Sequence, residues 1–180
     1  MKRKKVFIPW MFFSFIAFSV SMAEGLEAGR QAPFFRVKSG GGKLMTLDST
    51  RGKITVIFYE TRDVLEQNRK LRNELNQSYR ELGDTQKTYI VRLPIINCCD
   101  ARWPFTALWR KKLREGSRKS GVIIYGDWDG TMLSAYGMKE GESNVIIIDK
   151  KGIIRYFKSG RIEDDETGKI KNLIEHLLLE

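Results

Sequence analysis

Hydrophobic positions along the chain form two kinds of segment around residue 60. Residues 54–59 are a continuous apolar, β-branched and aromatic run, which predicts a strand buried on both faces. From residue 63 to residue 82 the apolar positions recur at helical spacing, and Gly83 is suited to end that helix. Asp63 is expected as its N-cap and Glu66 as the answering member of a capping box. The sequence therefore predicts a buried strand that runs into a helix, with the junction between them at the carboxyl end of the strand, where α/β domains place their sites.

The same patterns predict the remaining elements. Strands are expected at residues 34–37, 43–47, 88–93 (broken at Pro94), 121–125, 145–148 and 153–157. Helices are expected at residues 105–114 and 131–136, and a last one opens at the acidic residues 163–166. This alternation of strands and helices predicts an α/β domain.

The N-terminus has the pattern of a secretory signal peptide. Basic residues 2–5 precede the apolar run 6–20, and small residues stand at the expected cleavage site after Ala23. The run is short for a membrane span and contains Pro9, although an uncleaved anchor is the alternative. We therefore expect a leader at residues 1–23 and one exported, periplasmic domain at residues 24–180.

The net charge of the chain restricts its expected binding partners only moderately. The whole chain has a formal net charge of +10, and the leader holds four basic residues and no acid, so the expected mature chain has a net charge of +6. An exported protein of this charge is not expected to bind nucleic acid. Arg110, Lys111, Lys112 and Arg114 form the densest basic stretch, which either contacts an anionic surface weakly or is a solvated helix face.

The order of elements resembles the thioredoxin-like superfamily, in its redoxin branch, over roughly residues 29–179. The opening residues 29–34 (Gly-Arg-Gln-Ala-Pro-Phe) and the hairpin turn 149–152 (Asp-Lys-Lys-Gly) are similar to that branch. The closest similarity is to the YtfJ-like family of periplasmic proteins, on Asn97-x-x-Asp100-Ala101, Asp129-Gly130 and Glu142-Ser143. The resemblance implies a thioredoxin-like α/β fold with a mixed central sheet and helices on both faces.

The resemblance also implies where this chain departs from its relatives. In the superfamily a Cys-x-x-Cys pair follows the first central strand, and here Asp63 and Glu66 stand at those positions. Ser143 stands where the superfamily carries its cis-proline. Both parts of the dithiol machinery are therefore expected to be missing.

Cys98 and Cys99 are the only cysteines, and they are adjacent. An even cysteine count in an oxidising compartment favours a disulfide, but adjacent cysteines can close only a strained ring that is easily reduced. Such a pair would suit a redox switch, and Arg102 would help it by lowering a thiol pKa. The alternatives are free or partly buried thiols, or bridges to another chain.

Other chemistry finds little support in the sequence. The single histidine, His176, is expected to face solvent, and no ligand spacing indicates a metal or cofactor. Asp127 and Asp129 are interpreted as turn-forming residues rather than calcium ligands.

The function expected from the sequence is an exported thioredoxin-fold protein that binds an unknown protein or envelope partner, and a non-enzymatic role is favoured over an enzymatic one. The first alternative is a thiol oxidoreductase or peroxidase-like enzyme that uses Cys98 and Cys99. The second is an envelope or membrane-surface binding protein that uses its basic helix.

Overall fold

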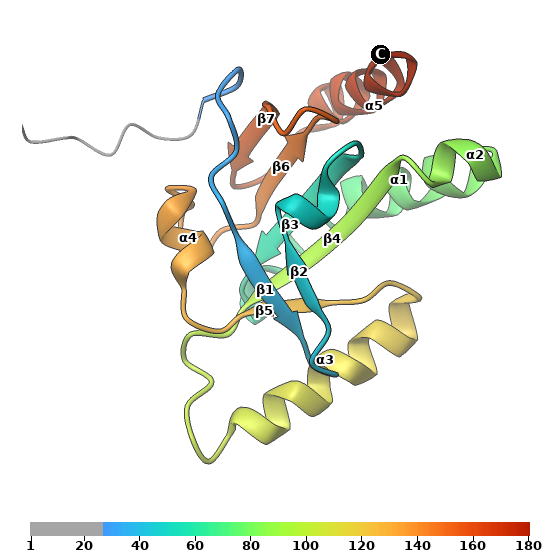
Figure 1. Cartoon of the computed structure of the whole chain (residues 1–180). Coiled ribbons are helices and arrows are strands. Elements are labelled where there is room, and N and C mark those ends of the chain that lie inside the picture. The colour runs from blue at the N-terminus through green and yellow to red at the C-terminus, as the bar shows by residue number, and fades with distance from the viewer. Residues whose placement is uncertain (1–26) are drawn as a thin grey trace, which may run out of the picture.

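The structure is a computed structural model that describes residues 27–180 and is built on one seven-stranded sheet (Figure 1). The strands, in the spatial order β2-β1-β5-β4-β3-β6-β7, are Leu44–Thr46, Arg36–Ser39, Tyr125–Asp127, Ile90–Asn97, Ile54–Glu60, Asn144–Ile148 and Ile154–Ser159. The helices are α1 (Arg69–Glu81), α2 (Asp84–Lys87), α3 (Thr106–Ser120), α4 (Thr131–Ala135) and α5 (Asp164–Leu179), with the short 3₁₀ turns η1 (Asp48–Thr50) and η2 (Arg62–Val64).

Strand β3 is the centre of this sheet, as the sequence predicts. All its residues are buried, because strands pair with it on both edges and side chains cover it on both faces. It runs parallel to β4 and antiparallel to β6. The sheet is therefore mixed, which confirms the expected architecture.

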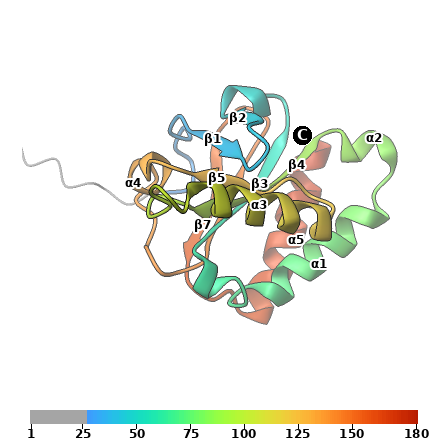
Figure 2. The same ribbon diagram turned by 90° about the horizontal axis from the view of Figure 1, so that it is seen from below.

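Helices cover both faces of the sheet, which is also as expected. On one face, Ile57 and Tyr59 of β3 pack with Met132 of α4 in the first core cluster. On the other face, Val56 and Phe58 of β3 pack with side chains of α1 and α5 in the second. The split follows from the alternation of side chains along a strand. Figure 2 shows α1 and α5 lying together, to one side of α3.

Helix α3 lies on the same face of the sheet as α1 and α5. Its Leu113 packs with Ile96 and Cys98 in a third, smaller cluster. Ile96 is on that face because it is paired with Glu60, two residues beyond Phe58. Two helices, α1 and α3, therefore stand over neighbouring parts of β3 and β4.

The junction after β3 differs from the sequence prediction. Helix α1 begins at Arg69 rather than at Asp63, and Asp63 lies in η2, whose N-cap Thr61 makes no side-chain capping bond. The expected capping box of Asp63 and Glu66 is wrong. The reason lies in Gln67 and Asn68, whose side chains bond to the loops before β6 and after β7 instead of continuing a helix.

Strand β4 also differs, because it continues through Pro94 to Asn97. The expected break at Pro94 is wrong. Strand β5 pairs with β4 only from Ile95 onward. At Pro94 there is therefore no hydrogen-bond ladder with β5, so the N–H that proline lacks interrupts none on that side. The consequence is that β4 reaches far enough to place Cys98 directly after its end.

Other boundaries shift modestly. Helix α3 extends to Ser120, beyond the expected residue 114, and β5 begins at Tyr125, at the end of the expected strand 121–125. The expected leader lies outside the described residues. Within residues 27–180 no helix has the length and hydrophobicity that a membrane span requires.

Candidate functional site

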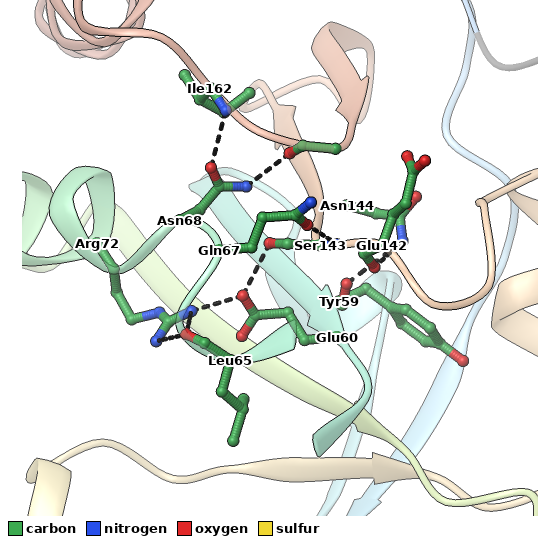
Figure 3. A network of polar contacts seen from close by, with 11 residues as sticks. Tyr59, Glu60, Leu65, Gln67, Asn68, Arg72, Glu142, Ser143, Asn144 and Ile162 are labelled. Atoms are coloured by element: carbon green, nitrogen blue, oxygen red, sulfur yellow. Dashed lines mark hydrogen bonds and ion pairs between the residues drawn. The ribbon is translucent and has the colours of Figure 1, made fainter. Parts of the chain in front are cut away.

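A buried carboxylate occupies the carboxyl end of the central strand. Glu60 is the last residue of β3 and is 2% exposed. Its Oε1 accepts hydrogen bonds from Ser143 Oγ at 2.8 Å and from Arg72 Nη2 at 2.5 Å (Figure 3). Arg72 also donates to the carbonyl oxygen of Leu65 at 3.1 Å, so its guanidinium is fixed between the strand end and the turn before α1. The corner is a closed polar network that joins β3, α1 and β6.

Burial dominates the electrostatics of Glu60. It raises the pKa of the carboxyl group above the ordinary value of 4.5, although Arg72 and Ser143 partly offset this effect. A carboxyl group can exchange a proton or attract a cation. It cannot cycle between thiol and disulfide, so the group buried at this corner offers no disulfide chemistry.

Ser143 completes the corner from the opposite strand. It is fully buried directly before β6, and its amide donates to Gln67 Oε1 at 2.7 Å. Among the described residues the one cis peptide bond is Trp103–Pro104, so the peptide bond before Ser143 is trans. Ser143 therefore lies beside the end of β3, where the resemblance places the cis-proline, and bonds both Glu60 and Gln67.

The two residues at the expected dithiol positions are both exposed. Asp63 lies in η2, and Glu66 forms an ion pair with Arg69 at 2.9 Å. Glu66 is close enough to Glu60 to raise the pKa of the Glu60 carboxyl slightly further. The structure thus brings Glu66 and Ser143 to one corner around Glu60, whereas the side chain of Asp63 is exposed to solvent.

The two cysteines lie at the end of β4 as free thiols. Cys98 is 1% exposed and Cys99 is half-buried. Burial, the Asp127 carboxylate and Cys99 raise the pKa of the Cys98 thiol to about 12. Arg102 is exposed, and the expected lowering of a thiol pKa by Arg102 is not found at Cys98.

Asp127 is a buried hydrogen-bond acceptor close to Cys98 rather than a simple turn residue. Its Oδ2 accepts from Tyr59 Oη at 3.0 Å and from the amides of Met132 and Leu133 at 3.1 and 3.2 Å. Its Oδ1 is buried without a partner, and burial raises the pKa of this carboxyl group. Asp129 does behave as a turn residue, since it is exposed and accepts from the amide and hydroxyl of Thr131.

The described residues hold no cluster of metal-ligating side chains. Residues 27–180 contain no group of three or more His, Cys, Asp or Glu side chains that could hold an ion. His176 is exposed, as expected, and lies 3.3 Å from Glu180.

The basic residues of α3 are exposed but partly engaged. Arg110 lies over the ring of Trp128, at 5.7 Å from its centroid, and Arg114 donates to the carbonyl oxygen of Gly40 at 2.9 Å. Lys111 is 4.0 Å from Glu115 of the same helix. The patch is a helix face with several internal contacts.

A groove of about 850 Å³ opens beside the Glu60 corner. It lies over β4 among α1, α5 and the C-terminal end of α3, and its lining includes Glu60 and Arg72. Because Glu60 and Arg72 belong to the lining, a molecule in the groove would reach the polar corner.

The sequence locates the junction and singles out Ser143, but it does not indicate the other residues that build the corner. Glu60 is the charged residue that directly follows the apolar run 54–59. This position is the signal in the sequence for a buried carboxylate. Gln67, Asn68 and Arg72 gave no signal, because each looks like an ordinary polar position of a surface helix.

The mixed sheet with its helices on both faces defines a protein of the thioredoxin-like α/β fold. Solved structures with this similarity include the thioredoxin domain of a thiol-disulfide oxidoreductase from Bacteroides vulgatus, with 19% identity, 83% and 99% of the two chains covered and a TM-score of 0.59. A peroxiredoxin-like protein from Aquifex aeolicus has 16% identity, 86% and 89% coverage and a TM-score of 0.57. The exposed lipoprotein thioredoxin Etrx1 of Streptococcus pneumoniae has 16% identity, 80% and 99% coverage and a TM-score of 0.57.

The sequence also assigns the chain to one family within this fold. A family model described as a bacterial protein of unknown function (YtfJ_HI0045) matches residues 47–177. The chain belongs to this family. The comparison with curated proteins gives no significant match.

Proposed function

We propose that this chain is an exported thioredoxin-fold binding protein that does not exchange disulfides. The observation that carries the proposal is the Glu60–Ser143 contact, supported by Arg72, at the corner where the resemblance places a dithiol and a cis-proline. A closed network of hydrogen bonds at that corner holds three elements in fixed positions and leaves no electron-transferring group there. The adjacent groove offers a surface on which a ligand can lie.

The rival proposal is a thiol oxidoreductase or peroxidase-like enzyme that uses Cys98 and Cys99. The fold of its solved neighbours favours that rival, but fold alone does not assign a reaction. Exchange requires a thiolate that a partner can reach. Cys98 is buried and its thiol has a pKa of about 12, which argues against it as the attacking group.

The experiment is an insulin-reduction assay with a dithiol donor, run beside a peroxide-consumption assay. We expect background turnover in both from the purified exported protein, and the same background from the Cys98→Ser/Cys99→Ser double variant. A thiol-disulfide oxidoreductase of the same fold serves as the positive control. Turnover above background that is lost in either single cysteine variant would establish the rival instead.

Export is the second part of the proposal, and the pattern at residues 1–23 supports it. Mass analysis of protein taken from the periplasm should give Glu24 as the first residue. An intact leader on the exported protein would contradict a freely diffusing periplasmic protein.

A further inference from the structure

The groove over β4 has the size and lining of a small-molecule site. Its volume of about 850 Å³ falls in the range of ligand pockets, which is roughly 300–1,000 Å³. The floor is the face of β4 that carries Arg92 and Pro94, and apolar side chains such as Leu75 of α1 and Val122 and Ile124 before β5 form its sides. These apolar side chains are only half-buried in this structure.

Two cations of the groove lining, Arg92 and Lys119, form no ion pair among the described residues, and of these Lys119 is exposed whereas Arg92 lies on the floor. Arg92 is half-buried on the floor, where its Nη1 donates to Asn76 Oδ1 at 3.1 Å and its guanidinium lies 4.0 Å from the centroid of the Tyr79 ring. No carboxylate of residues 27–180 forms an ion pair with it, although Glu81 and Glu175 also line the groove. Charges withdrawn from water are normally paired, so most of the guanidinium donors of Arg92 remain available to a ligand.

The end of the groove at Glu60, opposite Arg92, offers no unpaired cation. There Arg72 is already neutralised by Glu60, so that end offers no free cation to a second anion. Between the two ends, Pro94 and Ile96 form an apolar floor. From Arg92 to Ile96 the strand rises about 13 Å at about 3.3 Å per residue. The groove therefore combines one anion-binding end with an extended apolar track.

We propose that the groove binds a single-chain amphiphile with a carboxylate head group, such as a free fatty acid. The carboxylate pairs with the guanidinium of Arg92, whose planar donors match a carboxylate in bidentate geometry, and the alkyl chain lies along β4 toward Ile96 and the Glu60 corner. This inference rests on the proposed binding function and names its ligand class. The charge of Arg92 and the apolar track select an anionic amphiphile over a neutral or a purely polar ligand.

The test uses decanoate as the probe, titrated calorimetrically below its micelle concentration into the purified exported protein. We expect saturable one-site binding, because the groove holds one apolar track and one half-buried cation without an ion pair, Arg92. Arg92→Gln should weaken decanoate binding about tenfold or more, since it removes a charge-assisted hydrogen bond. The matched control is Arg80→Gln, which removes an exposed positive charge from α1 outside the groove lining and should leave binding unchanged.

Three further comparisons separate the contribution of the ligand's head group from that of its alkyl chain. Decanol, which lacks the charge, should bind the wild type and Arg92→Gln equally. Val122→Trp should fill the groove and weaken decanoate and decanol alike, and it keeps the test valid if Arg92→Gln does not fold. Arg92→Lys should retain part of the decanoate affinity, because it keeps the charge but loses the bidentate geometry.

Several outcomes would overturn this inference. The first is no saturable decanoate binding by the wild type, and the second is an equal loss in Arg92→Gln and Arg80→Gln. A wild-type dimer that Val122→Trp dissociates would assign the groove to a second copy of the chain. Because the insulin and peroxide assays report independently on thiol chemistry, absent decanoate binding with background turnover would remove the ligand assignment and leave the proposed function standing. Thiol-dependent turnover would remove the proposed function itself.

Discussion

Ser143 Oγ lies 2.8 Å from Glu60 Oε1, and this contact joins the start of β6 to the end of β3 at the centre of the sheet. Both side chains are buried, so the hydrogen bond is protected from water and its loss would leave a carboxyl oxygen with one partner fewer. Arg72 holds the same oxygen from α1. The corner is therefore better described as a fixed junction of three elements than as a site poised for covalent chemistry.

Replacement of Glu60 should change how stability depends on pH. The pKa of Glu60 is raised in the folded protein above the ordinary 4.5, so between these two values the folded state holds a proton that the unfolded state has lost. Stability therefore falls as pH rises through that window. Glu60→Gln cannot titrate, so the free energy of unfolding of the wild type minus that of Glu60→Gln should decrease as pH rises from about 4.5.

Urea unfolding at closely spaced pH values measures this difference. Glu66→Gln, which removes an exposed carboxylate at the same corner, is the control for the loss of one negative charge. A difference between wild type and Glu60→Gln that is constant or grows with pH would contradict the raised pKa.

Asn68→Ala should be strongly destabilising although the residue precedes a surface helix. Asn68 is 2% exposed, donates to the carbonyl oxygen of Gly160 at 2.8 Å and accepts from the amide of Ile162 at 2.8 Å. Its removal leaves two backbone groups unpaired, and we expect a cost of about 2–3 kcal/mol in the free energy of unfolding. Asn73→Ala, at an exposed position of α1, should stay within about 0.5 kcal/mol of the wild type. Equal effects of the two variants would show that the Asn68 bonds contribute no net stability.

The carboxylates of Asp127 and Asp129 should differ sharply in their contribution to stability. Asp127→Ala leaves Tyr59 Oη and two amides of α4 without their acceptor, and we expect a loss of about 3 kcal/mol. Asp129→Ala removes only an exposed acceptor of the Thr131 amide and hydroxyl and should cost about 1 kcal/mol. Chemical denaturation of both variants at one pH gives the comparison, and a larger loss for Asp129→Ala would contradict the buried role of Asp127.

The features that could be predicted from sequence are those that depend on local pattern. The uninterrupted apolar run 54–59 specifies a central strand by itself, and β3 was found there. The placement of Ser143 directly before the last hairpin also followed from the chain, since the apolar run after it marks β6.

The features that could not be predicted depend on contacts between distant segments. The start of α1 is set by Gln67 and Asn68, whose partners lie at Ser143, Gly160 and Ile162, far along the chain. Local capping signals at Asp63 and Glu66 were outweighed by these bonds. The difference between Asp127 and Asp129 is likewise invisible in sequence, because Asp127 ends β5 against Tyr59 and the amides of α4, whereas Asp129 lies in the exposed turn after that strand.

The last prediction concerns the two thiols, which their positions in the fold should separate. The half-buried Cys99 is open to a reagent, whereas Cys98 is 1% exposed and packs in the cluster of Ile96 and Leu113. The thiolate is the reactive form, and a pKa of about 12 keeps Cys98 protonated at mild alkaline pH. We therefore expect native protein to release one equivalent of chromophore from an aromatic disulfide reagent near pH 8, and denatured protein to release two.

Single variants assign that reactive thiol. Cys98→Ser should keep the native reaction, and Cys99→Ser should abolish it while leaving one thiol that reacts after denaturation. Fast native reaction of Cys98 in the Cys99→Ser variant would show that the end of β4 opens readily, which would restore Cys98 as a candidate nucleophile. Protection of both thiols in the native wild type would instead remove the cysteines from any redox role, because neither could then reach a partner.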